Sequence, residues 1–343
     1  MTPPPTAAND RAAARLDFAR RSLDLPGLGL ESASSDASFR SYWRTVGATP
    51  SRIVMDAPPE REDLRPWITV ARQLNAANLC APQILAEDLA QGFLLLSDLG
   101  RQTLLPLLDA SSVDQHYSRA IDIVVQMQCR LDASLLPAYD HQRLTDEMEL
   151  MPTWFLQRHL GYTPQCEEWD IIESAFQALL DSAAEQPQVF VHRDFHSRNL
   201  MVQDDGGLAV IDFQDAVSGP LSYDPVSLLR DCYIEWPDDQ VYAWLDRYRQ
   251  RLAEAGGPRI DSDRLRRWFD LIGLQRHIKV LGIFCRLWYR DGKAGYLADL
   301  PLVWRYTRRI GQRYEPTRPL IELIERSIGE REIRQPAPTA ETL

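Results

Sequence analysis

The chain has 343 residues, a net charge of −11 and a pI near 5.1, with 45% apolar and 25% charged residues. This length suffices for two lobes with separate cores, and the acidic balance argues against nucleic acid or an anionic membrane as a partner. The sequence contains no run of 18 apolar residues, so no membrane-spanning helix is expected.

The five cysteines are scattered along the chain and form no CxxC pair. This pattern favours reduced thiols over a disulfide framework or a zinc site. The first ten residues, MTPPPTAAND, lack the apolar core of a signal peptide. Together these features predict a cytoplasmic location.

The first part of the chain predicts a small lobe rich in strands. Residues 1–27 form an N-terminal extension with a helix expected from Asp10 to Leu23. Within residues 28–97, the segments GLGLESAS, RSYWRTVG and SRIVMDA each predict a strand. A helix is expected over Pro66–Ala76, with proline in its first turn, and residues 83–96 predict a hairpin.

The remainder predicts a larger helical lobe over residues 98–329 and a loose tail over residues 330–343. The segment Ser97-Asp98-Leu99-Gly100 connects the two lobes. A helix is expected to start at Asp224-Pro225, with Asp at the N-cap and Pro at the first helical position. Further helices are expected over residues 103–108, 113–131, 143–160, 167–185, 239–255, 261–289, 300–313 and 319–327.

The stretch QVFVHRDFHSRNLMVQDDGGLAVIDFQ, residues 188–214, carries the candidate chemistry. Its apolar runs and its Asp-Asp-Gly-Gly turn predict a strand, a polar loop and a β-hairpin. Three oxygen-bearing side chains then collect at strand ends, those of Asp194, Asn199 and Asp212. Such groups are the hard ligands that a cation like Mg²⁺ binds.

This layout, together with His192-Arg193-Asp194-(x)4-Asn199 and Ile211-Asp212-Phe213, resembles the protein-kinase-like fold. The resemblance implies an α+β, two-lobed architecture with a small β-rich N-lobe and a larger, mostly helical C-lobe. The sequence has DFQD instead of DFG and contains no APE segment. It therefore resembles small-molecule kinases of the aminoglycoside-phosphotransferase type more than protein kinases.

Five longer segments are similar to the anomeric N-acetylmuramate/N-acetylglucosamine kinases of cell-wall recycling. They are IVMDAPPE, GFLLLSDLG, HRDFHSRNLM, VIDFQDAVSGPLSYDPVSLLRDCY and KVLGIFCRLWYRDGK. The resemblance implies ATP-dependent phosphorylation of the C1 hydroxyl of either amino sugar in peptidoglycan recycling, with ATP and Mg²⁺ and no obligate protein partner. The alternatives are an aminoglycoside, choline or homoserine kinase of the same family, or a non-catalytic nucleotide-binding pseudokinase.

Residue roles follow from phosphoryl-transfer chemistry, which needs positioning and charge stabilisation. Asp194 is expected to accept the proton of the acceptor hydroxyl, and Asn199 and Asp212 are expected to bind Mg²⁺. His192 and Arg193 are expected to be structural, and Asp224 to be mainly a helix cap.

By resemblance, the backbone of Ser97 and Leu99 would meet adenine, with Leu96 lining the pocket behind it. The segment Ser34–Phe39, which includes Ser35 and Ser38, would cover the phosphates with N–H groups. Substrate contacts are assigned to His196, Arg198 and Asp215. His196 can equally be a packing residue, and Asp215 can instead bind metal or cap a turn. Sugar-binding residues are also expected near 147–158 and 289–290.

The sequence departs from the family pattern in its small lobe. Lys279 is the first lysine of the chain, so the third strand lacks the Lys that binds ATP phosphates in the family. The segment Trp67–Asn78 contains no acid, so the Glu that pairs with this Lys is missing as well. Arg44 is the candidate replacement cation.

Overall fold

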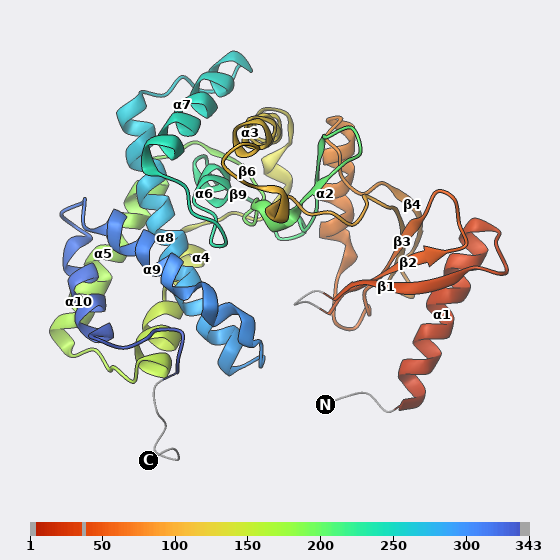
Figure 1. Ribbon diagram of the computed structural model, residues 1–343, viewed down its shortest axis with the longest axis horizontal. Helices are drawn as coiled ribbons and strands as arrows, with labels where there is room; N and C mark the ends of the chain where they lie inside the picture. The colour runs from red at the N-terminus through yellow and green to blue at the C-terminus, as the bar shows by residue number, and fades with distance from the viewer. Residues whose placement is uncertain (1–4, 36–38, 337–343) are drawn as a thin grey trace. The chain divides into compact units, whose positions relative to one another are not determined.

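In the computed structural model, residues 5–35 and 39–336 are described, and they divide into two units (Figure 1). The first unit comprises Met1–Leu104 and Arg198–Asp215, and the second comprises Leu105–Ser197 and Ala216–Leu343. The contacts thus group the segment Arg198–Asp215, which includes the predicted hairpin, with the small lobe. The limits of the functional lobes stay a prediction.

The first unit contains a five-stranded antiparallel sheet in the order β1-β2-β3-β5-β4. Its helix α2 (Leu64–Ala76) begins at the N-cap Asp63, whose side chain accepts a hydrogen bond from the Arg65 N–H. Pro66 lies in the first turn, as predicted, where its missing N–H costs nothing. The strands are β1 (Gly29–Ser35), β2 (Ser41–Val46), β3 (Arg52–Asp56), β4 (Ile84–Asp88) and β5 (Phe93–Ser97).

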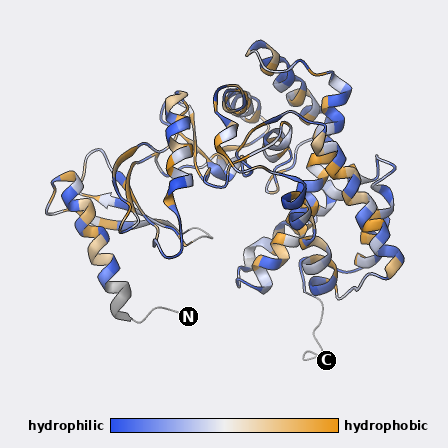
Figure 2. Cartoon of the chain, turned by 180° about the vertical axis from the view of Figure 1, so that it is seen from behind, coloured by the Kyte–Doolittle hydropathy of each residue, from blue (hydrophilic) through white to orange (hydrophobic). Residues whose placement is uncertain are grey.

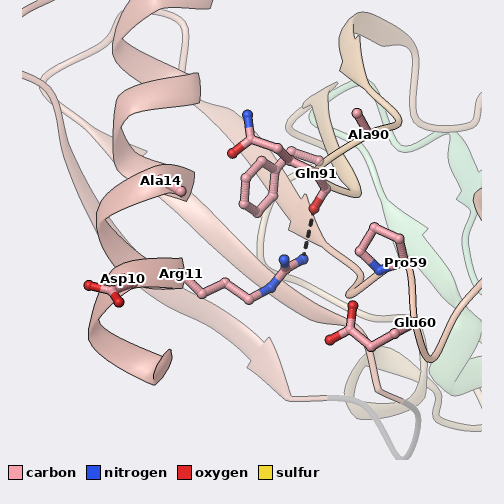
Figure 3. Close-up of a pocket in the computed structure, with 8 residues that line it drawn as sticks. Asp10, Arg11, Ala14, Pro59, Glu60, Ala90 and Gln91 are labelled. Atoms are coloured by element: carbon pink, nitrogen blue, oxygen red, sulfur yellow. Dashed lines mark hydrogen bonds between the residues drawn. The ribbon is translucent and has the colours of Figure 1, made fainter. Parts of the chain in front are cut away.

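Helix α1 (Pro5–Leu23) covers one face of this sheet through an apolar core. Arg11 Nε and Arg15 Nη1 each donate to the Asp56 carboxylate at 2.8 Å. Arg11 also donates to the Gln91 carbonyl at 3.1 Å, so it joins α1 to the β4–β5 turn (Figure 3). The N-terminal helix is therefore part of the first unit. The core residues are Phe18, Ala19, Leu28, Val54, Phe93 and Leu95.

In the second unit, the long helix α8 (Ser262–Tyr289) contacts most of the other helices (Figure 1). The predicted helix over 143–160 is in fact two elements, α4 (His141–Met148) and a π-helix, η3 (Met151–His159). The other helices are α3 (Val113–Arg130), α5 (Cys166–Ala184), α6 (Tyr223–Leu229), α7 (Asp238–Glu254), α9 (Leu300–Gly311) and α10 (Arg318–Ile328). The short 3₁₀ turns are η1 (Leu105–Leu107), η2 (Ala133–Leu135), η4 (Ser197–Asn199) and η5 (Ala294–Asp299).

The segment that follows residues 188–214 contains a strand that sequence analysis missed. β6 (Gln188–Val191) pairs with β9 (Val217–Pro220), while the predicted hairpin consists of β7 (Leu200–Val202) and β8 (Leu208–Val210). β9 carries Gly-Pro, a pair that is rare inside strands, so propensity conceals it.

Hydrophobic and hydrophilic residues alternate along most helices, as expected for helices that pack on one side (Figure 2). Among the residues that the structure describes, no helix has both the length and the apolar composition needed to cross a membrane.

Gly282 allows α8 to approach the backbone of the segment that joins α4 to η3. A Cβ at this position would lie 2.2 Å from the carbonyl carbon of Leu150 and 2.4 Å from its oxygen. We expect Gly282→Ala to destabilise the protein by about 2–3 kcal/mol, because backbone atoms must move. Thermal unfolding measures this loss, with the exposed Gly295→Ala as a control, since a Cβ there meets nothing within 4 Å. Equal melting temperatures for the two variants would contradict the close approach.

Candidate active site

The backbone of the loop that carries Asp194, the candidate base, is held by a buried carboxylate. Asp224 is fully buried, and its two oxygens accept hydrogen bonds from the His192 N–H at 2.8 Å and the Arg193 N–H at 3.1 Å. The predicted helix-cap role of Asp224 is wrong: the N-cap of α6 is Ser222, and Asp224 is the second residue of the helix. Its function is to fix a loop about thirty residues upstream.

Arg193 has the structural role that its position predicted. Its φ of 76° lies in the left-handed region, which is unfavourable for a long side chain. Its guanidinium pairs with Glu147 and lies over the Tyr139 ring, 5.3 Å from the centroid. Lys279 Nζ binds the same Glu147 carboxylate at 2.9 Å. This partly buried cluster therefore offsets the strained conformation of the loop.

Asp194 projects from this loop with its side chain 44% exposed. Arg276 Nη2 of helix α8 lies 3.5 Å from one carboxylate oxygen. Burial by itself would raise the pKa of Asp194, but the nearby cations, first Arg276 and then Lys279, hold it well below its ordinary value. Asp194 is thus an ionised acceptor at neutral pH.

The segment 231–233 supports the end of the loop. The Ser197 N–H and hydroxyl both donate to Asp231, at 3.0 Å from the N–H. Asp231 also accepts from the Tyr233 N–H at 3.0 Å, and the Tyr233 ring meets the His196 ring edge-on with centroids 5.3 Å apart. His196 therefore lies beside Asp194 in a half-buried aromatic environment.

In the first unit, the structure brings the two predicted metal ligands together. Asn199 Nδ2 lies 3.3 Å from Asp212 Oδ2, and the Ile211 N–H donates to the Asn199 carbonyl at 3.1 Å. Gln214 Nε2 donates to the other Asp212 oxygen at 2.9 Å. Phe213, fully buried, packs against Trp67 of α2 with centroids 5.0 Å apart, which fixes the position of its neighbour Asp212.

This pair of side chains fits a hard cation that completes its coordination elsewhere. Both supply oxygen, and Asp212 is one-third exposed. In the described ranges, no group of three or more His, Cys, Asp or Glu residues is arranged to hold a metal. One carboxylate and one amide match Mg²⁺, which binds proteins through few ligands and fills the rest with phosphate oxygens and water.

The connector residues are braced within the first unit. The Ser97 N–H donates to the Gln83 carbonyl at 2.9 Å, and the Leu99 carbonyl accepts from Gln203 Nε2 at 3.0 Å. Leu96 is buried and pairs in register with Ile53, on the sheet face opposite α1. The adenine role of these residues stays a prediction. A polar cavity of about 900 Å³ adjoins the connector and is lined in part by Arg44, Asp98 and Leu99.

Arg44 makes three hydrogen bonds at this connector. Its Nε and Nη2 donate to the two Asp98 oxygens at 2.6 and 2.9 Å, and Nη2 also donates to the Gly100 carbonyl at 2.7 Å. This bidentate pair holds β2 to the connector. The phosphate-binding role predicted for Arg44 has no support from these contacts and stays untested.

The other predicted site residues are separated between the two units. Arg198 and Asp215 are exposed and belong to the first unit, whereas His196 belongs to the second. The backbone of Ser35 lies in β1, and Ser38 lies outside the described residues. Sequence analysis missed Arg276, Asp231 and Tyr233. A signal existed for Arg276, because it stands with Lys279 in the largely apolar segment Leu271–Phe284 of α8.

A sequence profile of the phosphotransferase enzyme family matches residues 29–267. The chain belongs to this family. It is 45% identical over 302 residues to an N-acetylmuramate/N-acetylglucosamine kinase of Pseudomonas aeruginosa, covering 88% of this chain and 89% of that protein. A protein of the same name in Neisseria meningitidis is 39% identical, covering 88% and 91%.

Solved structures of two small-molecule kinases share the fold. An ethanolamine kinase of Plasmodium vivax superposes with a TM-score of 0.62 at 10% identity, covering 86% of this chain and 87% of that one. A choline kinase of Streptococcus pneumoniae gives 0.60 at 11% identity, covering 85% and 98%. The predicted two-lobed, protein-kinase-like fold is thereby confirmed.

Burial raises the pKa of Asp224 from 3.8 to about 7, although the two N–H donors oppose this shift. Between these pH values the folded protein holds a proton that the unfolded chain releases, so the contribution of Asp224 to stability falls as pH rises. We expect the advantage of the wild type over Asp224→Asn in free energy of unfolding to shrink by about 2 kcal/mol from pH 5 to pH 7. Urea denaturation of both proteins at each pH measures this difference in free energy of unfolding. A constant difference would contradict the shift.

Proposed function

We propose that this phosphotransferase transfers the γ-phosphate of ATP to the anomeric hydroxyl of N-acetylmuramate or N-acetylglucosamine, in peptidoglycan sugar recycling. The names of relatives 39–45% identical over 88% of the chain support the choice of sugar. The observation that supports the reaction is the position of Asp194, which lies partly exposed on a braced loop and pairs with the buried Arg276.

The weak basicity of Asp194 suits this acceptor. A carboxylate with a lowered pKa is a poor base towards an ordinary alcohol. An anomeric hydroxyl is a hemiacetal and more acidic, so it needs less help to lose its proton. Asp194 would orient this hydroxyl through a hydrogen bond and accept the proton as the bond to phosphorus forms.

Asn199 and Asp212 would hold Mg²⁺, which neutralises charge on the phosphate groups when bound. The left-handed backbone of Asp212, φ 63°, and the Phe213–Trp67 contact hold this carboxylate in place, which supports the proposal. The roles of Leu96, Ser97 and Leu99 towards adenine, and of Ser35 and Ser38 towards phosphates, are part of the same proposal.

Aromatic rings beside Asp194 offer a face for the sugar. Tyr233 is half-buried, meets His196 on one side and stacks on Phe284 of α8 on another, with centroids 6.5 Å apart. Aromatic faces pack well against the apolar faces of pyranose rings. We assign His196 and Tyr233 to the sugar, and Arg198 and Asp215 as further substrate contacts. The proposed substrate is therefore an amino sugar, and the proposed location of the protein is the cytoplasm.

An acceptor panel tests the proposal. ADP release is measured with N-acetylmuramate, N-acetylglucosamine, choline and an aminoglycoside, at equal concentrations with ATP and Mg²⁺. We expect turnover with one or both amino sugars and little with the other two. Turnover with choline or the aminoglycoside alone would replace the proposed substrate. Nucleotide binding without any turnover would favour a pseudokinase.

Asp194→Asn tests the proposed base. This change keeps the side chain's size and one oxygen but removes its ability to accept a proton. We expect kcat to fall by about 10²–10⁴-fold, with the KM for ATP nearly unchanged. Full activity in the variant would contradict the role of Asp194.

The ion pair with Arg276 predicts a pH effect. Because Arg276 lowers the pKa of Asp194, its replacement raises that pKa and moves the acidic limb of the kcat profile to higher pH. We expect this shift in Arg276→Met and a smaller one in Arg276→Lys, which keeps the charge. An unchanged limb in both variants would show that Asp194 does not govern it.

A further inference from the structure

The first unit contains a buried guanidinium held between two acids. Arg40 lies immediately before β2 and is 5% exposed. Its Nη1 lies 3.2 Å from Glu62 Oε1, in the segment that leads into α2. Its Nη2 lies 4.0 Å from Asp212 Oδ1, a carboxylate oxygen of the proposed metal ligand. Arg40 thus connects β2, α2 and the metal-binding carboxylate.

The first unit has few buried cationic side chains that could bind an anionic ligand. The unit contains no lysine, because the two lysines of the chain are Lys279 and Lys293. Among its described residues, two other arginines are buried. Arg15 is bound to Asp56, and Arg44 is bound bidentately to Asp98. Only Arg40 of these three approaches an acid assigned to the metal.

The two contacts of Arg40 differ in distance, 3.2 Å to Glu62 and 4.0 Å to Asp212. The Glu62 contact is a close ion pair to a carboxylate 22% exposed, which orients the guanidinium. The Asp212 contact, at 4.0 Å, is too long for a hydrogen bond. A phosphate oxygen on the cation held by Asp212 would lie close to Asp212 and therefore within reach of the same guanidinium. Planar guanidinium groups bind phosphate oxygens with two parallel hydrogen bonds.

We propose that Arg40 binds the nucleotide phosphates and that Glu62 positions it, in place of the Lys–Glu pair that the sequence lacks. The inference rests on the proposed ATP-dependent transfer but not on the identity of the sugar. Because the proposed contact is with the charged phosphates, removal of Arg40 should lower the affinity for a nucleotide more as its number of phosphates increases. A purely structural brace between β2 and α2 would affect all nucleotide ligands alike.

Calorimetric titration of ADP and adenosine into Arg40→Gln, with Mg²⁺ and without acceptor, separates these two roles. We expect the affinity for ADP to fall at least tenfold, while the affinity for adenosine stays within twofold of the wild type. Arg40→Lys keeps the charge and should recover part of the loss. Glu62→Gln should weaken ADP binding less than Arg40→Gln does. Arg72→Gln, on an exposed arginine of α2, is the matched control and should bind ADP as the wild type does.

Steady-state kinetics provide a second readout. Arg40→Gln should raise the KM for ATP and leave the KM for the sugar unchanged. Wild-type ADP affinity in Arg40→Gln would overturn the proposal, and so would an equal loss of ADP and adenosine affinity in both Arg40→Gln and Arg40→Lys. Because the titration uses no acceptor, an error in the assigned sugar cannot affect it. Failure of the wild type to bind ADP would overturn the nucleotide-dependent function itself.

Discussion

The carboxylate of Asp224 is the interaction on which the candidate site most depends. By accepting two backbone N–H groups, it sets the conformation of His192 and Arg193 and so the direction in which Asp194 projects. A buried acid would be costly without such donors, and the loop would lose two buried hydrogen bonds without the acid. The strained backbone of Arg193 persists because Glu147 and this acid constrain it from two sides.

Buried arginines carry much of the electrostatics in both units. In the second unit, Arg276 lies 3.5 Å from Asp194 and, with Lys279, lowers the pKa of this carboxyl. In the first unit, Arg15 and Arg44 tie neighbouring elements to Asp56 and Asp98, and Arg40 approaches the proposed metal ligand. In a chain with only two lysines, the proposed phosphate contact comes from a guanidinium group. Such groups are always charged and bind phosphate bidentately, which suits the task.

Much of the fold could be predicted from local sequence patterns. Strand alternation, helix caps and the HRDxxxxN spacing each depend on residues that are close together in the sequence. The sequence could not show partners that are distant along the chain. Asp224 has the local pattern of a helix cap, yet its partners lie 32 and 31 residues upstream. The Arg40–Glu62 pair depends on how β2 meets α2, and its only sequence signal was the absence of lysine. Strand β9 could not be predicted because it contains Gly-Pro, which has a low strand propensity. Its pairing with β6 outweighs this local preference.

The central claim is that the phosphate is transferred to a hemiacetal hydroxyl, the C1 hydroxyl of the sugar. The most direct measurement is the phosphorus NMR spectrum of the product formed from ATP and N-acetylglucosamine labelled with carbon-13 at C1. A phosphate bonded through oxygen to C1 is split by coupling to the labelled carbon. The account predicts this splitting, and its loss in unlabelled sugar. A sugar phosphate signal without coupling to C1 would place the phosphate on another hydroxyl and contradict the claim.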